Sequence, residues 1–219
     1  MSNYEGIVSR IADIILSPEA SLGLIHGIIS VPVDLGYMAY GIFDTSTHYS
    51  HQTETIRIIE AINRGILNYD RILEAIELIY SQFELYVSLS KKNEIYSRAS
   101  ASLVGRSITN TVISKKIAST IAQRGGWLVA IRGGIVGNIL LLEGMKERCI
   151  RTSRQLSIDE PEIYQALRAQ DYDLLYFMFE PALKPFVEAI TIRRMDGISA
   201  FNKIIEHVES KLSGHHALH

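Results

Sequence analysis

The sequence predicts an all-α fold, a multi-helix bundle in which central apolar, glycine-rich helices are wrapped by amphipathic helices. Apolar residues make up 47% of the 219 residues and charged residues 21%, which is enough for a substantial core and excludes general disorder. Apolar side chains recur at three- and four-residue spacing along most of the chain, and alternating strand patterns are nearly absent. We expect one all-α domain over residues 1–219, with a candidate subdomain boundary near residues 151–157.

The first part of the chain carries four helical patterns. The first pattern has a face made of Ile7, Ile11, Ile14 and Ile15. Ser17 and Pro18 begin a second helix as an N-cap and a first-turn proline. A third helix is predicted over residues 51–67, with a stripe made of Ile56, Ile59, Ile62 and Ile66. The fourth follows a cap at residues 68–70, and its buried face consists of Ile72, Ile76, Ile79, Phe83 and then Tyr86.

The last third of the chain repeats this theme after an expected break at residues 151–154. Three helix starts are predicted: at Ser157 or Asp159 before Pro161, at Asp171 or Asp173, and at Asp196 or Gly197. Pro181 and Pro185 must kink or divide the middle helix, because an internal proline lacks a backbone donor. The apolar face of the last helix consists of Ile198, Phe201, Ile205, Val208 and Leu212.

Two segments differ from ordinary bundle helices, and the first runs from residue 20 to residue 43. Its only formally charged side chain is Asp34. It is longer than the roughly 20 apolar residues that a membrane-spanning helix needs, but Pro32 should divide it into two short helices. Gly23 and Gly27 form a G-x-x-x-G spacing, which lets helices approach closely. The segment is therefore a broken or hairpin-like candidate for membrane insertion.

The second segment covers residues 95–142. No acidic residue occurs between Glu94 and Glu143, and six basic residues give this stretch +6, leaving −8 for the rest of a chain whose net charge is −2. Small residues form a four-residue stripe, at Ser114, Ala118, Ala122, Gly126, Ala130 and Gly134, and Gly133 and Gly137 add an overlapping G-x-x-x-G. Residues 127–142 contain a single charge, Arg132, which needs a partner or a water-filled pore in a membrane.

The remaining chemistry-bearing residues favour no catalytic or metal function. No catalytic motif of specific spacing occurs, so we expect no enzyme activity and no cofactor. Asp44, His48 and His51 match no metal motif, and we expect no metal. Cys149 has no histidine near it in sequence, which favours a packed thiol over a nucleophile. The net charge of −2 and the scarcity of aromatic residues among the six bases argue against nucleic acid.

In its two low-charge segments, residues 20–43 and 114–137, the chain resembles pore-forming antibacterial toxins. It is similar in architecture to the colicin pore domains, which hold a buried hydrophobic hairpin. It is also similar to the type VI secretion effectors that depolarise a rival's inner membrane with glycine-zipper helices. A departure is that about 70 residues separate the two segments here, where a colicin has one continuous hairpin.

The resemblance implies insertion into membrane lipid, self-association there, no catalysis and a cognate immunity protein in the producing cell. The first residues lack the basic start and apolar stretch of a secretory signal, so we expect cytoplasmic synthesis and a signal-independent route to a target inner membrane. The alternative is a soluble all-α binding, adaptor or immunity-type protein, in which the small-residue stripe only packs a central helix.

Overall fold

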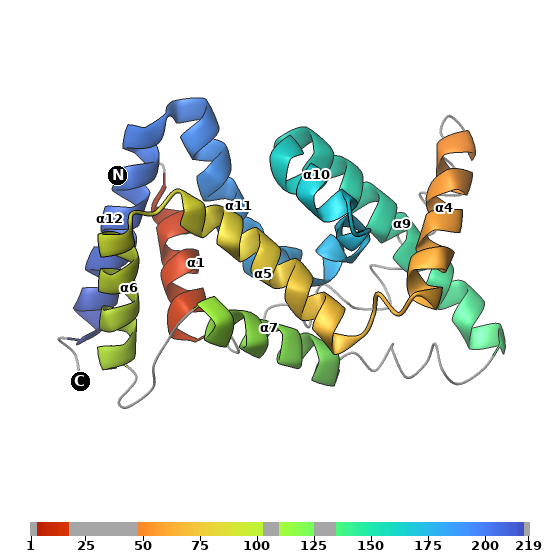
Figure 1. The fold of residues 1–219 in the computed structure, drawn as a ribbon, viewed down its shortest axis with the longest axis horizontal. Helices are drawn as coiled ribbons and strands as arrows, with labels where there is room; N and C mark the ends of the chain where they lie inside the picture. The colour runs from red at the N-terminus through yellow and green to blue at the C-terminus, as the bar shows by residue number, and fades with distance from the viewer. Residues whose placement is uncertain (1–3, 18–47, 103–109, 125–134, 217–219) are drawn as a thin grey trace. The chain divides into compact units, whose positions relative to one another are not determined.

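The computed structural model describes residues 4–17, 48–102, 110–124 and 135–216. Within these residues every regular element is a helix and no strand occurs, which confirms the all-α class (Figure 1). The chain forms two compact units, each built from separated stretches of sequence. Unit 1 comprises residues 1–23, 76–117 and 181–219, and unit 2 comprises residues 24–75 and 118–180.

Unit 1 is organised around α12 (Ile198–His216), which packs against α1 (Glu5–Leu16) and α6 (Leu89–Ser102). The predicted face of the first helix is confirmed at Ile11, and that of the last helix at Phe201 and Leu212, which are all fully buried. Ile198, predicted to belong to the same face of the last helix, is 60% exposed instead, because it lies in the first turn of α12, directly after Gly197. Ion pairs reinforce the packing of α6 on α12: Glu209 lies 2.5 Å from the Lys91 ammonium and 2.9 Å from the Arg98 guanidinium.

Four aromatic rings fill the centre of unit 1. Phe83, near the end of α5 (Tyr69–Leu85), lies 5.1 Å from the Phe186 ring and 5.7 Å from the Phe201 ring, measured between centroids. Phe186 belongs to α11 (Tyr176–Asp196), and its ring is 4.9 Å from that of Tyr80. The edge-on geometries are those that aromatic rings prefer in cores. The face predicted for residues 72–83 is therefore the buried face of α5.

Unit 2 is built from α4 (His48–Asn63), α9 (Ile135–Asp159), the short α10 (Pro161–Arg168) and the 3-10 helix η3 (Tyr172–Leu175). α9 packs against α4, α10 and η3. α5, α7 (Asn110–Arg124) and α11 contribute residues to both units. Gly65 adopts φ +78° in the turn after α4, a conformation that favours glycine, and α5 begins four residues later.

The inward face of α4 differs from the predicted isoleucine stripe at its first position, Ile56. The Ile56 side chain is 59% exposed, and Ile58 is buried in its place. Ile66 is buried as expected but lies beyond the end of the helix. The prediction is wrong at Ile56, because charged residues occupy the inward side of the helix there: Glu54 and Arg57 point inward together with Ile58 and Ala61. The side chains of Ile59 and Ile62 lie outside the described residues. A search for apolar periodicity cannot recognise a helix face that is buried through ion pairs.

Two further predictions about helix ends are corrected. The break expected at residues 151–154 lies within α9, and Ser157 and Asp159 belong to the last turn of that helix instead of starting the next one. Only Glu160 separates α9 from Pro161, which fits the first position of α10 because that position needs no backbone donor.

The prolines of α11 do not divide it. α11 is one helix from Tyr176 to Asp196 with Pro181 and Pro185 inside it. Their four-residue spacing places both missing donors on the same side of the helix, so the hydrogen bonds of the other side can continue. The helix of residues 18 onward, predicted from Ser17 and Pro18, lies outside the described residues.

Candidate functional site

The structure describes only part of the predicted stripe of small residues. Ser114 and Ala118 are fully buried on α7, and Ala122 is half-buried on the same helix. Gly137 lies in the first turn of α9. The other residues singled out for insertion or helix packing lie outside the described residues: Gly23, Gly27, Asp34, Gly126, Ala130, Arg132, Gly133 and Gly134.

Ser114 takes part in a chain of polar contacts in unit 1. Its hydroxyl lies 3.0 Å from the Asn110 side-chain oxygen, and the Asn110 amide donates to Glu84 at 2.8 Å. The second oxygen of Glu84 accepts a hydrogen bond from the Tyr96 hydroxyl. The stripe is therefore closely packed at its start, and its polar residue, Ser114, has a hydrogen-bond partner there.

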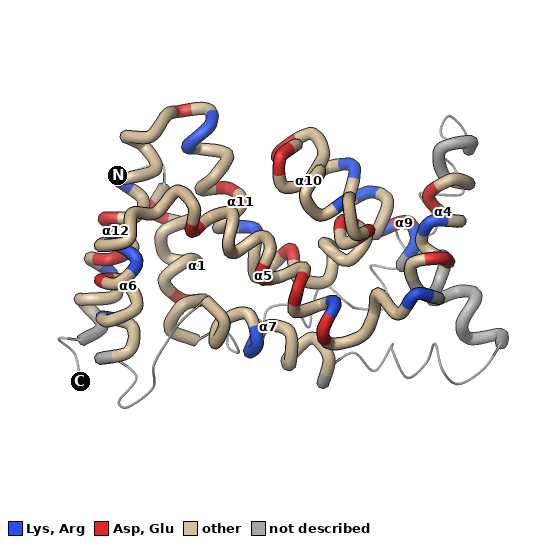
Figure 2. The backbone as a smooth tube through the Cα atoms, in the orientation of Figure 1, with Lys and Arg blue, Asp and Glu red and all other residues tan. Residues whose placement is uncertain are grey.

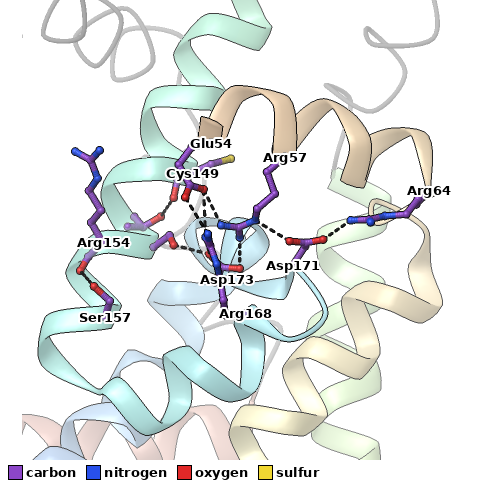
Figure 3. A network of polar contacts seen from close by, with 11 residues as sticks. Glu54, Arg57, Arg64, Cys149, Arg154, Ser157, Arg168, Asp171 and Asp173 are labelled. Carbon is purple, nitrogen blue, oxygen red and sulfur yellow. Dashed lines mark hydrogen bonds and ion pairs between the residues drawn. The ribbon is translucent and has the colours of Figure 1, made fainter. Parts of the chain in front are cut away.

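Charged residues are spread over most of the described helices (Figure 2), but unit 2 holds a dense cluster around Arg57. Figure 3 shows the charged residues of this cluster: Glu54, Arg57, Arg64, Arg168, Asp171 and Asp173. Together with Ser153, which bonds to Asp173, they form what we call the Arg57 network. Arg57 lies at its centre and donates to Glu54 at 2.6 Å, to Asp171 at 2.7 Å and to Asp173. One guanidinium thus joins three carboxylates, which its planar fork of donors allows.

The remaining members complete the cluster from other elements. Arg168, the last residue of α10, donates to Glu54 at 3.0 Å and to Asp173 at 3.4 Å. The Ser153 hydroxyl of α9 lies 2.5 Å from Asp173. The network therefore connects α4 and α9 with the turn between α10 and η3.

Asp171 precedes η3 and Asp173 lies within it, and the backbone at Asp171 is uncommon. Asp171 adopts φ 62°, the only positive φ of a non-glycine residue in the part of the chain described. Aspartate tolerates this left-handed conformation better than most residues do. Both oxygens of Asp171 are used, one by Arg57 and the other by Arg64. These ion pairs hold the turn in its conformation.

The network is balanced in charge but unevenly buried. Three arginines face three carboxylates; the Asp173 side chain is fully buried, Arg57 is 14% exposed and Arg64 is 62% exposed. Burial raises the pKa of Asp173, and the hydrogen bonds from Arg57 and Ser153 oppose that shift. Such buried clusters add little net stability compared with apolar packing, but losing one partner is costly. We interpret the network as a specific clamp between elements of unit 2.

Cys149 lies close to the network, and its surroundings suppress the reactivity of its thiol. Cys149 is buried in α9, and burial raises the pKa of its thiol to about 12, with the charge of Asp173 adding to the shift. A thiol with that pKa is a poor nucleophile. Among the described residues, no group of three His, Cys, Asp or Glu side chains is placed to hold a metal ion.

An open pocket of about 230 Å³ lies beside the network in unit 2. Arg64 and Asp171 line it, together with Arg71 and Tyr172. The Arg71 guanidinium donates to Glu74 at 3.1 Å and to the Tyr172 hydroxyl at 3.3 Å. The pocket is therefore polar, and its arginines already have carboxylate partners.

The described helices were also compared with the dimensions of a membrane span. None of them combines the length and the apolar character that crossing a bilayer requires.

The Arg57 network was not foreseen from the sequence. Arg57 and Asp173 are 116 residues apart, and Glu54 and Arg168 are 114 apart, so no local spacing relates them. The only local signal is the pair of opposite charges three residues apart on α4, Glu54 and Arg57, and such pairs are common on exposed helix faces. No protein-family model, curated protein or solved structure matches the chain.

Proposed function

We propose that this chain is a membrane-active, pore-forming antibacterial effector. In this proposal it inserts apolar, small-residue-rich helices and depolarises the inner membrane of a target cell without catalysis. Membrane lipid and further copies of the chain are its partners in the membrane, and a cognate immunity protein protects the producing cell. It is made in the cytoplasm and reaches its target by a signal-independent route.

The segregation of charge is the observation that carries this proposal. Residues 95–142 hold six basic residues and no acidic one, and residues 20–43 hold one charge in 24 residues. Basic residues beside apolar stretches suit an anionic bilayer surface. The stripe of small residues supports close helix association where the hydrophobic effect between helices is absent.

The Arg57 network bears on this proposal through its position in the sequence. α4 follows the first low-charge segment within five residues, and α9 contains the end of the second. The network connects α4 to α9 through Asp173. If both low-charge segments insert, this clamp must separate, so we expect Arg57→Met to release dye from anionic vesicles faster than the wild type does.

Conductance across a planar bilayer tests the proposal directly. Purified wild-type protein should give discrete conductance steps in membranes that contain phosphatidylglycerol, and it should release dye from liposomes of the same composition. The matched control for Arg57→Met in the dye-release experiment is the exposed variant Arg64→Met, which removes a peripheral ion pair of the same network. Absence of both conductance and dye release at every lipid composition would contradict the pore.

A soluble all-α binding or adaptor protein is the second candidate function. The open pocket at Arg64, Arg71 and Asp171 favours it, because convergent polar groups in a concave site can hold a small polar ligand. The burial of Ser114 and Ala118 also agrees with a stripe that serves packing alone. A folded protein that binds no vesicles, together with the absence of conductance, would favour this function over the pore.

A further inference from the structure

The open pocket of unit 2 is lined by three stretches of the chain, all of which belong to that unit. Arg64 lies in the turn after α4, Arg71 lies in the first turn of α5, and Asp171 and Tyr172 lie at the start of η3. The volume of about 230 Å³ is below the roughly 300–1,000 Å³ of pockets that hold drug-sized molecules. The pocket therefore suits a small polar group.

The carboxylate that lines this pocket already has its hydrogen-bond donors. Asp171 accepts from Arg57 at 2.7 Å through one oxygen and from Arg64 through the other (Figure 3). The hydroxyl of Tyr172 is used as well, because it donates to Glu74 at 2.5 Å. A ligand that brings hydrogen-bond donors therefore finds these acceptors occupied by protein groups.

The two arginines of the pocket, by contrast, keep most of their donors. A guanidinium carries five N–H groups. Within the described residues, Arg64 uses its Nη2 alone, toward Asp171, and Arg71 uses its Nη1 alone, toward Glu74 and the Tyr172 hydroxyl. The hydrogen-bonding groups that remain at the pocket are therefore mainly donors, and they complement a ligand that is rich in acceptors.

The ion pairs of the two arginines do not prevent them from binding a ligand. Arg64 is 62% exposed, and the paired side chains of Arg71 and Glu74 are 53% and 54% exposed. Exposed ion pairs contribute little, so both guanidiniums can turn toward a ligand at a small cost. Asp171 keeps its largely buried partner Arg57 when Arg64 turns away, so the aspartate is not left without a cation.

We propose that this pocket binds a phosphate group between Arg64 and Arg71. The planar fork of a guanidinium matches two oxygens of a phosphate. A tetrahedral phosphate has enough oxygens to accept from both arginines at once, whereas a carboxylate has only two. The inference rests on the soluble binding function proposed above and names its ligand class, and a lipid headgroup is the other source of the same group.

Isothermal titration calorimetry with inorganic phosphate at constant ionic strength tests the site. Arg64→Met and Arg71→Met should each weaken the binding about 10-fold, because each removes charge-assisted hydrogen bonds, and the exposed positions leave the fold intact. Glu74→Gln should tighten the binding about 3-fold, because Arg71 then loses a competing carboxylate. Arg10→Met and Glu188→Gln are matched controls from an ion pair of unit 1 and should bind phosphate as the wild type does.

Flotation with vesicles of phosphatidic acid and phosphatidylcholine distinguishes the two sources of the phosphate. Binding of inorganic phosphate without vesicle binding assigns a free phosphorylated molecule, and vesicle binding that inorganic phosphate reverses assigns a headgroup. Absence of both kinds of binding, or wild-type affinity in both arginine variants, would overturn the site. The pore is judged separately by conductance: phosphate binding without conductance keeps the site and retires the pore, whereas conductance without phosphate binding keeps the pore and retires the site.

Discussion

At the scale of single residues, Arg57 shows how a charge can define the inside of a helix. Its guanidinium bridges Glu54, Asp171 and Asp173 in unit 2 and is largely withdrawn from solvent. Arg64 binds the same Asp171 from a mainly exposed position. The two arginines make the same kind of ion pair at different burial, so together they separate the effect of burial from that of charge.

We expect Arg57→Met to lower the free energy of unfolding by about 3 kcal/mol near neutral pH, because it leaves a buried carboxylate without its main cation. Arg64→Met should cost less than about 1 kcal/mol, since exposed ion pairs contribute little. Urea denaturation followed by circular dichroism measures both. Equal losses in the two variants would show that the burial of Arg57 does not matter.

The pH dependence of the Arg57→Met defect follows from Asp173. Burial raises the pKa of Asp173 in the folded protein above the ordinary value of 3.8, so its contribution to stability is fully present below that value and falls as the pH rises. Without Arg57 the pKa should rise further, and this fall should become steeper. The defect should therefore be smaller in acid than at neutral pH, and a defect that grows in acid would contradict this account.

Cys149 should be protected from thiol reagents in the folded protein. Its pKa of about 12 and its burial leave little thiolate and little access, so the reaction with a disulfide reagent near pH 8 should be at least about 100-fold slower than in urea. A folded pKa above the ordinary 9.0 also means that this stability contribution is lost as the pH rises from 9.0 toward 12. In this pH range the free energy of unfolding of Cys149→Ala should therefore fall less than that of the wild type. Rapid modification of the thiol in the native protein would refute its burial.

At the scale of elements, α7 tests the close packing of the small-residue stripe. Ala118 is fully buried there, whereas Lys115 is exposed on the same helix. We expect Ala118→Leu to cost about 1–3 kcal/mol because the added methylenes have no room, and Lys115→Leu to change stability little. Thermal unfolding compares the two variants, which introduce the same side chain. An unchanged melting temperature for Ala118→Leu would remove close packing at this position.

At the scale of the whole molecule, the rest of the stripe decides between a pore and a packed core. Gly126→Leu, Ala130→Leu and Gly134→Leu should each reduce conductance and toxicity if the stripe assembles helices in the membrane, because a large side chain keeps their backbones apart. The comparison must be made between variants that remain folded, since stability changes alone fit both functions. Folded variants with wild-type conductance would exclude the stripe as the assembly surface.

Arg132 is the single charge of residues 127–142 and provides a separate test of the pore. If its side chain lines the pore, Arg132→Glu should shift the ion selectivity toward cations, because it reverses the charge of the lining. The reversal potential in a salt gradient measures this shift. Lys203→Glu, at an exposed position of α12 outside both low-charge segments, is a charge-matched control, and an equal shift in both variants would argue against a local effect of Arg132.

Local pattern was sufficient for much of the fold. The helical class and the buried faces of α1, α5 and α12 follow from residues three and four positions apart, because neighbours on a helix face are close in sequence. Ile72, Ile76 and Ile79 are all fully buried as predicted. The low-charge segments and their charge segregation are likewise properties of the sequence alone, and the pore that they suggest remains a proposal.

The tertiary structure alone decided which charged residues are buried and which apolar ones are exposed. In the sequence, Glu54 and Arg57 form a pair of opposite charges like those on exposed helix faces. The fold buries this pair by placing it against Arg168, Asp171 and Asp173, which are more than 100 residues away in the chain. Ile198 was predicted to belong to the buried face of the last helix, and the structure leaves it exposed. The physical reason is that the burial of a charge depends on partners distant in sequence, whereas helix periodicity records only neighbours along the same helix.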